Sequence, residues 1–200
     1  MARTRSASAH LKVLEAGLEL MAERGVDATS MDAIAEASGV SKATIYKHWA
    51  DKDALLLEIM AHANGLTSRP KFDSGKTRED MVAVLSHRPA ERAELRERLT
   101  PHFIAYSARN PTFGLVWRNM VMEPPRRELR YLLKLGVQKK ELAPEVDSDL
   151  SLALLLGPII YWHVFLNNKK ITESPRDLAE GVVDAFWKAF GVGVRRQRTK

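Results

Sequence analysis

The sequence contains no cysteine among its 200 residues. Disulfide bonds, thiolate nucleophiles and metal sites with cysteine ligands are therefore excluded. The six histidines lie far apart, and the HExxH, P-loop, GxSxG and GxGxxG patterns are all missing. No spacing of residues thus recommends a metal, a cofactor or an enzyme, although side chains distant in sequence could still converge in space.

Long hydrophobic runs are also scarce. The first residues, MARTRSASAHLK, are basic but lack a following apolar core, so they do not form a secretory signal. The longest apolar stretch, 150–166, is at the short limit for crossing a bilayer and contains Gly157 and Pro158. A helix buried between partners explains this stretch better than a transmembrane span. We therefore expect a cytoplasmic protein.

The net charge of +6 suggests a polyanionic partner, but its distribution complicates that inference. Residues 1–65 carry seven Lys or Arg and nine Asp or Glu, a net charge of −2. In the first helix, Glu15, Glu19 and Glu23 share one face, which we expect to be exposed and directed away from DNA. A nucleic-acid surface in this half must depend on where individual charges point.

Nearly every extended apolar pattern has the period of an α-helix, and no stretch alternates over the length of a strand. The predicted fold class is all-α, with about nine helices. A composition shift at 64–75, rich in Gly, Ser, Pro and Lys, indicates a loop between domains. We predict a three-helix helix-turn-helix domain with a linking fourth helix in residues 1–65, a larger helical domain in 66–192, and a mobile basic tail in 193–200.

Capping residues delimit the predicted helices. Gly25 and Gly39 are expected to end the first two helices. The expected N-caps of the next three are Thr29 or Ser30, then Ser41, then Asp51. Further on, Thr77 with Asp80, and Ser174 with Pro175 and Asp177, are typical of helix starts. The later helices are predicted at about 90–109 with an interruption near Pro101, after Pro111, and at 125–140, 149–166 and 175–190.

The most informative segment runs from Gly25 to Leu56. A recognition helix enters the major groove only if a preceding helix braces it through a tight turn. Ala35, Gly39, Val40 and Ile45 supply that turn and the small or aliphatic residues at the helix crossing. The exposed side of the next helix then offers the cationic and hydrogen-bonding groups that phosphates and base edges need, namely Lys42, Thr44, Tyr46, Lys47 and His48.

This segment resembles the TetR family of regulators. The residues that match the family pattern in register are Ala16, Gly25, Thr29, Ser30, Ile34, Ala35, Gly39, Val40, Ser41, Thr44, Ile45, Tyr46, Trp49, Lys52, Leu55 and Leu56. Gly17 and Ser38 stand where alanine is usual, so slightly looser helix packing is expected. Residues 136–190 also resemble one of the family's C-terminal domain types, whereas the middle of the chain resembles the family least.

The resemblance implies a set of DNA contacts. Thr29 and Ser30 would hold a phosphate at a helix N-terminus, and Arg3 and Arg5 would enter the minor groove as a flexible arm. Lys42, Thr44, Lys47 and Ala43 would face base edges, and Tyr46, His48 and Lys52 would hold the backbone. Ser41 completes the predicted DNA-binding set. Ile34, Val40, Ile45 and Trp49 are interpreted as core, while Tyr46 fits either role.

The resemblance also implies a homodimer, because one helix-turn-helix reads only a few base pairs and two copies would match a palindromic site. The helices at 149–166 and 175–190 would pair with their copies as a four-helix bundle. The alternative is that they form the core of a monomer. The predicted interface residues are Leu150, Leu154, Pro158, Trp162, Leu178, Val182, Phe186 and Phe190.

The remaining helices are expected to enclose a pocket for an unidentified small-molecule inducer. The candidate lining is Phe103, Tyr106, Trp117, Met120, Tyr161 and Phe165, with His102, Arg118 and His163 as polar groups, although each could instead be plain core or surface. The sequence thus predicts a repressor that binds a palindromic operator and releases it when ligand shifts the recognition helices. A nucleoid-like protein that binds DNA without sequence preference is the alternative.

Overall fold

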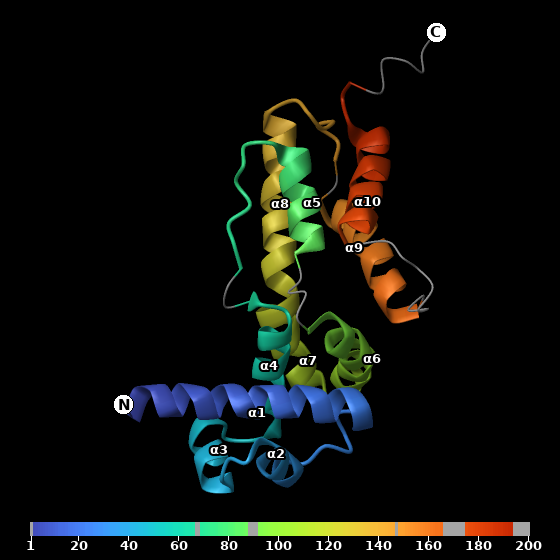
Figure 1. Cartoon of the computed structure of the whole chain (residues 1–200). Helices are drawn as coiled ribbons and strands as arrows, with labels where there is room; N and C mark the ends of the chain where they lie inside the picture. The colour runs from blue at the N-terminus through green and yellow to red at the C-terminus, as the bar shows by residue number, and fades with distance from the viewer. Residues whose placement is uncertain (1, 67–68, 88–91, 147, 166–174, 194–200) are drawn as a thin grey trace. The chain divides into compact units, whose positions relative to one another are not determined.

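The computed structural model describes residues 2–66, 69–87, 92–146, 148–165 and 175–193, in which every extended element is helical (Figure 1). This confirms the predicted all-α fold. Besides the helices, an isolated β-bridge pairs Leu142 with Gly191. The predicted basic tail lies outside the described residues, apart from its first residue, Gly193.

The first four helices are α1 (Ala2–Arg24), α2 (Met31–Ser38), α3 (Lys42–His48) and α4 (Lys52–Ala63). Their predicted capping residues are confirmed, with Ser30 rather than Thr29 as the N-cap of α2. Each N-cap oxygen accepts from a backbone N–H three residues on: Ser30 from Ala33 at 3.1 Å, Ser41 from Thr44 at 3.3 Å, and Asp51 from Ala54 at 2.8 Å. Gly25 and Gly39 follow α1 and α2 with φ of 83° and 66°, a left-handed conformation that favours glycine.

The later elements are α5 (Thr77–Ser86), α6 (Ala93–Arg109), α7 (Pro111–Trp117), a π-helical turn η3 (Arg118–Met122), α8 (Glu123–Gln138), α9 (Ser148–Phe165) and α10 (Pro175–Phe190). The predicted interruption near Pro101 is wrong, because α6 continues through it. Proline removes only one backbone hydrogen-bond donor from the helix. The burial of Leu99 and Phe103, on either side of Pro101, offsets this loss and stabilises the continuous helix.

The start of α5 also differs from its prediction. Thr77 is the first helical residue rather than the cap, and Lys76 precedes it without a capping side chain. The Asp80 carboxylate instead accepts from the backbone N–H of Ser74 at 3.1 Å, so it holds the preceding turn. Pro175 begins α10 as expected, while its predicted cap, Ser174, lies outside the described residues.

By their contacts, the helices form two compact units. The first comprises Met1–Arg69 and Pro89–Met122, and the second comprises Pro70–Arg88 and Glu123–Lys200. The chain thus crosses between units near the loop predicted at 64–75, and then α6, α7 and η3 pack with the helix-turn-helix segment. The assignment of separate roles to residues 1–65 and 66–192 stays a prediction.

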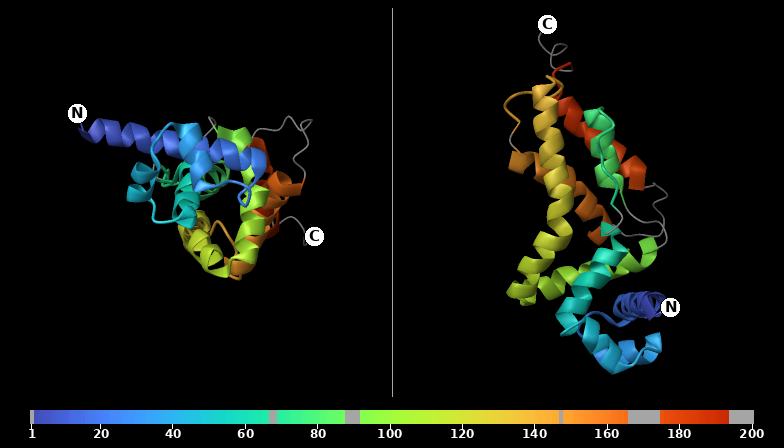
Figure 2. Two further views of the ribbon diagram at one scale, coloured as in Figure 1. Left: turned by 90° about the horizontal axis from the view of Figure 1, so that it is seen from below. Right: turned by 90° about the vertical axis from the view of Figure 1, so that its left-hand side faces the viewer.

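In the first unit, α1 is the central helix and contacts α2, α4 and α6. Two views agree that α2 and α3 lie on one side of α1 and α6 on the other (Figures 1 and 2). Leu18, Ile34 and Leu55 are fully buried at these contacts. Gly17 faces Ile59 where α1 meets α4. The packing there is close, so the looser packing expected from Gly17 is wrong.

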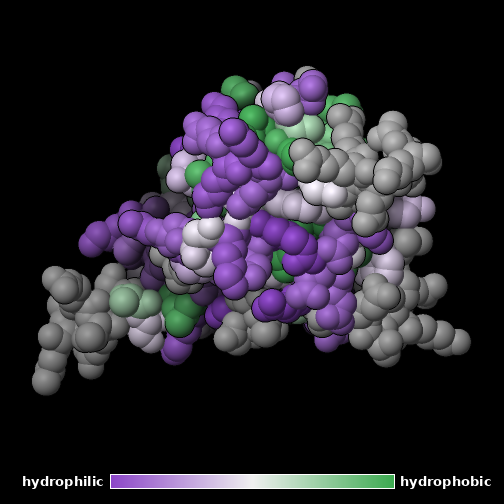
Figure 3. Space-filling view, turned by 90° about the horizontal axis from the view of Figure 1, so that it is seen from above, coloured by the Kyte–Doolittle hydropathy of each residue, from purple (hydrophilic) through white to green (hydrophobic). Residues whose placement is uncertain are grey.

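In the second unit, α5, α8 and α10 run side by side (Figure 1), and α9 contacts all three. Met81, Leu129 and Val183, from α5, α8 and α10, are fully buried in its core. No described helix is sufficiently long and apolar to traverse a lipid bilayer. Hydrophilic residues cover most of the described surface seen in Figure 3, with hydrophobic residues showing in small groups.

Candidate nucleic-acid interface

Helix α3 has one anchored face and one free face. Ile45 and Trp49, at its inner side, are 1% and 3% exposed, and both belong to the core of the first unit. The residues exposed on its outer side are Ser41, Lys42, Ala43, Tyr46, Lys47 and His48, and Thr44 is half-buried. The structure therefore presents the predicted polar face of this helix to solvent, and Tyr46 is 51% exposed.

Local contacts order the first turn of α3. The Ser41 and Thr44 hydroxyls lie 2.9 Å apart, within hydrogen-bond distance. Lys42 Nζ pairs with Asp32 Oδ2 of α2 at 2.7 Å, and both side chains are more than half exposed. An exposed ion pair of this kind contributes about 0–1 kcal/mol, so a competing anion can displace Asp32 at small cost.

The two residues before α2 have different environments. Ser30 is exposed at the N-terminus of the helix. Thr29 is 1% exposed, and its hydroxyl donates to the carbonyl of Gly25 at 2.9 Å. The prediction that the Thr29 hydroxyl holds a phosphate therefore does not fit, because this group satisfies a buried carbonyl at the end of α1. Ser30 keeps the predicted position.

Lys52 begins α4 beside an acidic loop. Its ammonium donates to the backbone carbonyl of Asp27 at 3.4 Å. Burial lowers the pKa of Lys52, and the negative charges of Asp27 and Asp53 act in the opposite direction. Arg109 of α6 forms an ion pair with the carboxylate of Asp27. Asp27 thus contacts both Lys52, a predicted phosphate-binding residue, and Arg109 of α6.

Arg3 and Arg5 lie in the first turns of α1, since the helix begins at Ala2. Their backbone is helical rather than the predicted flexible arm, which is consistent with an alanine- and serine-containing segment that lacks proline and glycine. The side chains of these two arginines lie outside the described part of the structure.

Helix α6 and the residue before it contact α4 and α1 through polar side chains that no sequence pattern indicated. Arg96, 2% exposed, donates to the carbonyl of Ala63 at the end of α4 at 3.0 Å. Burial lowers the pKa of Arg96. Just before α6, Arg92 pairs with Glu15 of α1. Glu15 is therefore half-buried, whereas Glu19 and Glu23 are exposed as predicted.

The predicted ligand-binding residues fall into two groups, one in each compact unit. In the first unit Phe103 is fully buried against Phe113, and the Tyr106 hydroxyl donates to Asp53 Oδ1 at 2.7 Å. Trp117 is half-buried, and His102, Arg118 and Met120 are exposed. In the second unit Tyr161 and Phe165 are exposed, and the side chain of His163 lies outside the described part. A shared pocket for these nine residues stays a prediction.

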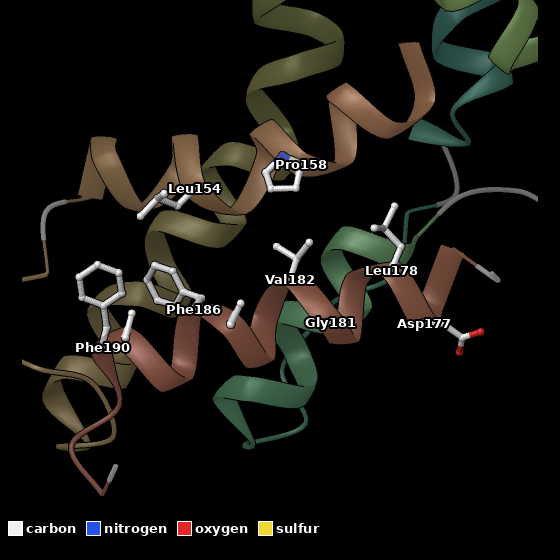
Figure 4. A pocket seen from close by; sticks show the side chains of 10 residues that line it. Leu154, Pro158, Asp177, Leu178, Gly181, Val182, Phe186 and Phe190 are labelled. Carbon is white, nitrogen blue, oxygen red and sulfur yellow. The ribbon is translucent and has the colours of Figure 1, made fainter. Parts of the chain in front are cut away.

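The predicted dimer residues do come together. An apolar groove of about 570 Å³ between α9 and α10 is lined by six of them, Leu154, Pro158, Leu178, Val182, Phe186 and Phe190 (Figure 4). Leu150 and Trp162 lie on α9 outside this lining. Gly181, Ala185 and Ala189 also line the groove. Their spacing of four residues was the sequence signal that could have identified them.

Among the described residues, no group of three or more His, Asp or Glu side chains is arranged to hold a metal ion. Lys42 of α3 forms an ion pair with Asp32 of the neighbouring helix α2.

Known proteins match this chain along most of its length. Residues 13–59 match the family described as "Bacterial regulatory proteins, tetR family", and residues 72–186 match "Tetracyclin repressor-like, C-terminal domain". The HTH-type transcriptional regulator YdeS of Bacillus subtilis is 31% identical over 186 residues, 92% of this chain and 91% of the relative. The DNA-binding transcriptional repressor TetR of Mycobacteroides abscessus is 27% identical over 147 residues, 74% and 75% of the two chains. The transcriptional regulator FadR of Bacillus subtilis, solved in complex with stearoyl-CoA, has a TM-score of 0.63 and 19% identity, covering 87% of this chain and 95% of FadR.

Proposed function

Because the chain belongs to the TetR family of bacterial regulatory proteins, we propose that it binds a palindromic operator as a homodimer and represses transcription until a small molecule releases it. Family membership makes the chain a helix-turn-helix DNA-binding transcriptional regulator rather than an enzyme. Family membership alone does not establish the homodimer, the palindromic operator, the repression or the release by ligand, and these four features are proposed.

The observation that carries the proposal is the free polar face of α3. With Ile45 and Trp49 anchored in the core, this face can enter a major groove without unfolding any part of the helix. Lys42, Thr44 and Lys47, with the small Ala43 between them, would contact base edges. Phosphates would be held by Ser30, Tyr46, His48 and Lys52, three of which lie at or next to a helix end.

Two kinds of variant test this division of roles. Lys52→Ala should weaken binding to all duplexes alike and lower the slope of log K against log salt by about 1. Lys47→Ala and Thr44→Ala should each relax discrimination at particular base pairs by about 1–3 kcal/mol. Binding of operator and scrambled duplexes is compared over a range of salt, with Lys134→Ala, an exposed lysine of α8, as the control.

Equal losses on all sequences for both kinds of variant would contradict base reading and favour a protein that binds DNA without sequence preference. Thermal unfolding of each variant shows whether the fold is kept. This matters most for Lys52, which also donates to the carbonyl of Asp27.

The proposed dimer would use the groove between α9 and α10. Leu154 and Phe190 are apolar side chains that face this groove from the two helices (Figure 4). The small residues on α10, Gly181, Ala185 and Ala189, permit close approach of a partner helix. A second copy related by a two-fold axis would cover the groove and set the distance between two α3 helices.

The proposed release by ligand would act through α6. Tyr106 and Arg109 on this helix contact Asp53 and Asp27, which flank Lys52 and the start of α4. A ligand that displaces α6 would therefore also displace α4 and, with it, the position of α3. The fold holds stearoyl-CoA in FadR, which supports a small molecule as the effector class.

Thermal-shift screening followed by a DNA-release assay tests this coupling. Compounds that raise the unfolding temperature by binding should also weaken operator affinity. If compounds fill a pocket and leave operator affinity unchanged, the coupling is refuted.

A further inference from the structure

Two His–Glu contacts join helices α1 and α4. In one contact α1 supplies the histidine, and in the other α1 supplies the glutamate. His10 of α1 contacts Glu58 of α4, with 2.6 Å between Nε2 and Oε1. Five residues further along α1, Glu15 contacts His62 of α4, with 2.9 Å between Oε1 and Nε2. Each contact joins residues 47 or 48 positions apart in the sequence.

In each contact a third side chain also donates a hydrogen bond to the glutamate, and this third side chain differs between the two contacts. The indole Nε1–H of Trp49 donates to Glu58 Oε2 at 2.7 Å, so the first contact reaches the residue that ends α3. The guanidinium of Arg92 donates to Glu15, so the second contact reaches the segment before α6. We call these the Glu58 contact and the Glu15 contact.

The Glu58 contact holds the end of α3 in two ways. The Trp49 side chain is 3% exposed, and the His10 ring stacks on it with centroids 4.6 Å apart and an interplanar angle of 26°. The His48 ring meets His10 edge-on at 5.5 Å. Since a buried indole N–H needs an acceptor, removal of the Glu58 carboxylate favours a new orientation of Trp49.

We propose that Glu58 and His10 are positioning residues that fix the orientation of α3 through Trp49, and thereby set how well the outer face of α3 reads base sequence. The inference rests on the proposed function, in which α3 enters the major groove. Trp49 is the C-cap of a helix of only seven residues, so a rotation at this end moves every side chain on its outer face. Direct readout depends on hydrogen-bond geometry held within about 0.5 Å.

The Glu15 contact provides a matched control. It lies in the same α1–α4 interface and uses the same pair of residue types, but its third partner is Arg92 rather than a residue of α3. If the Glu58 contact acts merely by stabilising α1 against α4, loss of either carboxylate should have the same effect on DNA reading.

The experiment compares Glu58→Leu, Glu58→Gln, Glu15→Leu and Trp49→Phe in the full chain. The side-chain oxygen of glutamine can still accept from the Trp49 indole N–H, so Glu58→Gln should keep the discrimination of the wild type. For a duplex selected from a random pool, Glu58→Leu should lower the ratio of operator to scrambled affinity by about tenfold. Glu15→Leu should lower the unfolding temperature but leave this ratio within about twofold.

Amide and indole ¹H–¹⁵N spectra without DNA give a second readout, with Trp49→Phe identifying the indole signal of Trp49. Glu58→Leu should shift the signals of residues 42–49, and Glu15→Leu should not. Unchanged α3 signals in a folded Glu58→Leu protein, or equal effects of both leucine variants on discrimination, would overturn the inference. If the wild-type protein itself fails to discriminate between duplexes, the proposed function fails, and the spectra still decide whether Glu58 positions α3.

Discussion

A Cβ atom at Gly17 of α1 would lie 2.5 Å from Cδ1 of Ile59 on α4. Ile59 is fully buried, and Ile34 of α2 lies 3.7 Å from the same point. The hydrogen of glycine therefore permits three helices to meet closely at the centre of the first unit. On α4, Ile59 lies between Glu58 and His62, the residues that this helix contributes to the two His–Glu contacts.

The Gly17–Ile59 contact predicts non-additive stabilities. Gly17→Ala gains about 1 kcal/mol of helix propensity but overpacks the core at a cost of about 1–3 kcal/mol, so we expect a net loss of about 1 kcal/mol. Ile59→Val removes the clashing methyl, and alone should also cost about 1 kcal/mol. The double variant should be more stable than the sum of the singles by about 1 kcal/mol or more, measured by urea unfolding. Additive changes would contradict the close contact.

The Glu15 carboxylate predicts a dependence of stability on acid pH. The hydrogen bond from Arg92 lowers the pKa of Glu15, with a further contribution from His62, against the opposing effect of burial. A carboxyl group whose pKa is lowered by folding stabilises the protein above its unfolded pKa, about 4.3. The difference in unfolding free energy between wild type and Glu15→Gln should thus be full at about pH 5 and shrink as the pH falls below about 4. A difference that stays constant or grows on acidification would refute this assignment.

The raised pKa of Tyr106 predicts a loss of protein stability at alkaline pH. Burial, together with the hydrogen bond to Asp53, raises the pKa of Tyr106 to about 12. Because the protonated phenol is favoured in the folded state, its stabilising contribution is complete below the ordinary pKa of about 10 and is lost as the pH rises through the folded value. Tyr106→Phe should cost about 1–2 kcal/mol at neutral pH.

Tyrosinate absorbance checks the raised pKa of Tyr106 directly. The sequence has four tyrosines, and Tyr106→Phe should remove the step that titrates at the highest pH. Loss of a step near pH 10 instead would show that the phenol of Tyr106 is not held by Asp53.

If the groove between α9 and α10 is the dimer interface, a single charge placed in it should prevent dimerisation. Leu154 is 45% exposed, so Leu154→Glu should leave the monomer folded. In a dimer that covers the groove, the same carboxylate would be buried without a partner, at a cost of about 2–5 kcal/mol. Analytical ultracentrifugation should show a dimer for wild type and monomers for the variant, whereas Tyr131→Glu on α8, 60% exposed and outside the groove lining, should remain dimeric. A dimer unaffected by Leu154→Glu would place the interface elsewhere.

The features predictable from the sequence are those set by nearby residues. Ser30, Ser41 and Asp51 cap helices through hydrogen bonds that span three residues, and the helical period alone separates the buried Ile45 from the exposed Lys47. The same period places Leu178, Val182 and Phe186 on one side of α10. These interactions require no knowledge of the tertiary fold.

The features that escaped prediction depend on residues far apart in the chain. Glu15 was expected to be exposed because its helical face is acidic, but Arg92 lies 77 positions away and covers it. Thr29 is an exception among these features: the resemblance implied that it holds a phosphate at a helix N-terminus, but its hydroxyl donates to the carbonyl of Gly25, only four residues away. No local pattern distinguishes His10 and Glu58, whose partnership exists only in the folded first unit.

Selection of bound duplexes from a random DNA pool, followed by measurement of the number of chains per duplex, tests the central claim most directly. If the free face of α3 reads bases in duplicate, the enriched sequences will share a palindrome whose half-sites are separated by about one helical turn, 10–10.5 base pairs, or a multiple of it. Two or a multiple of two chains will then bind each site. An unenriched pool, or an asymmetric site occupied by one chain, would contradict the account.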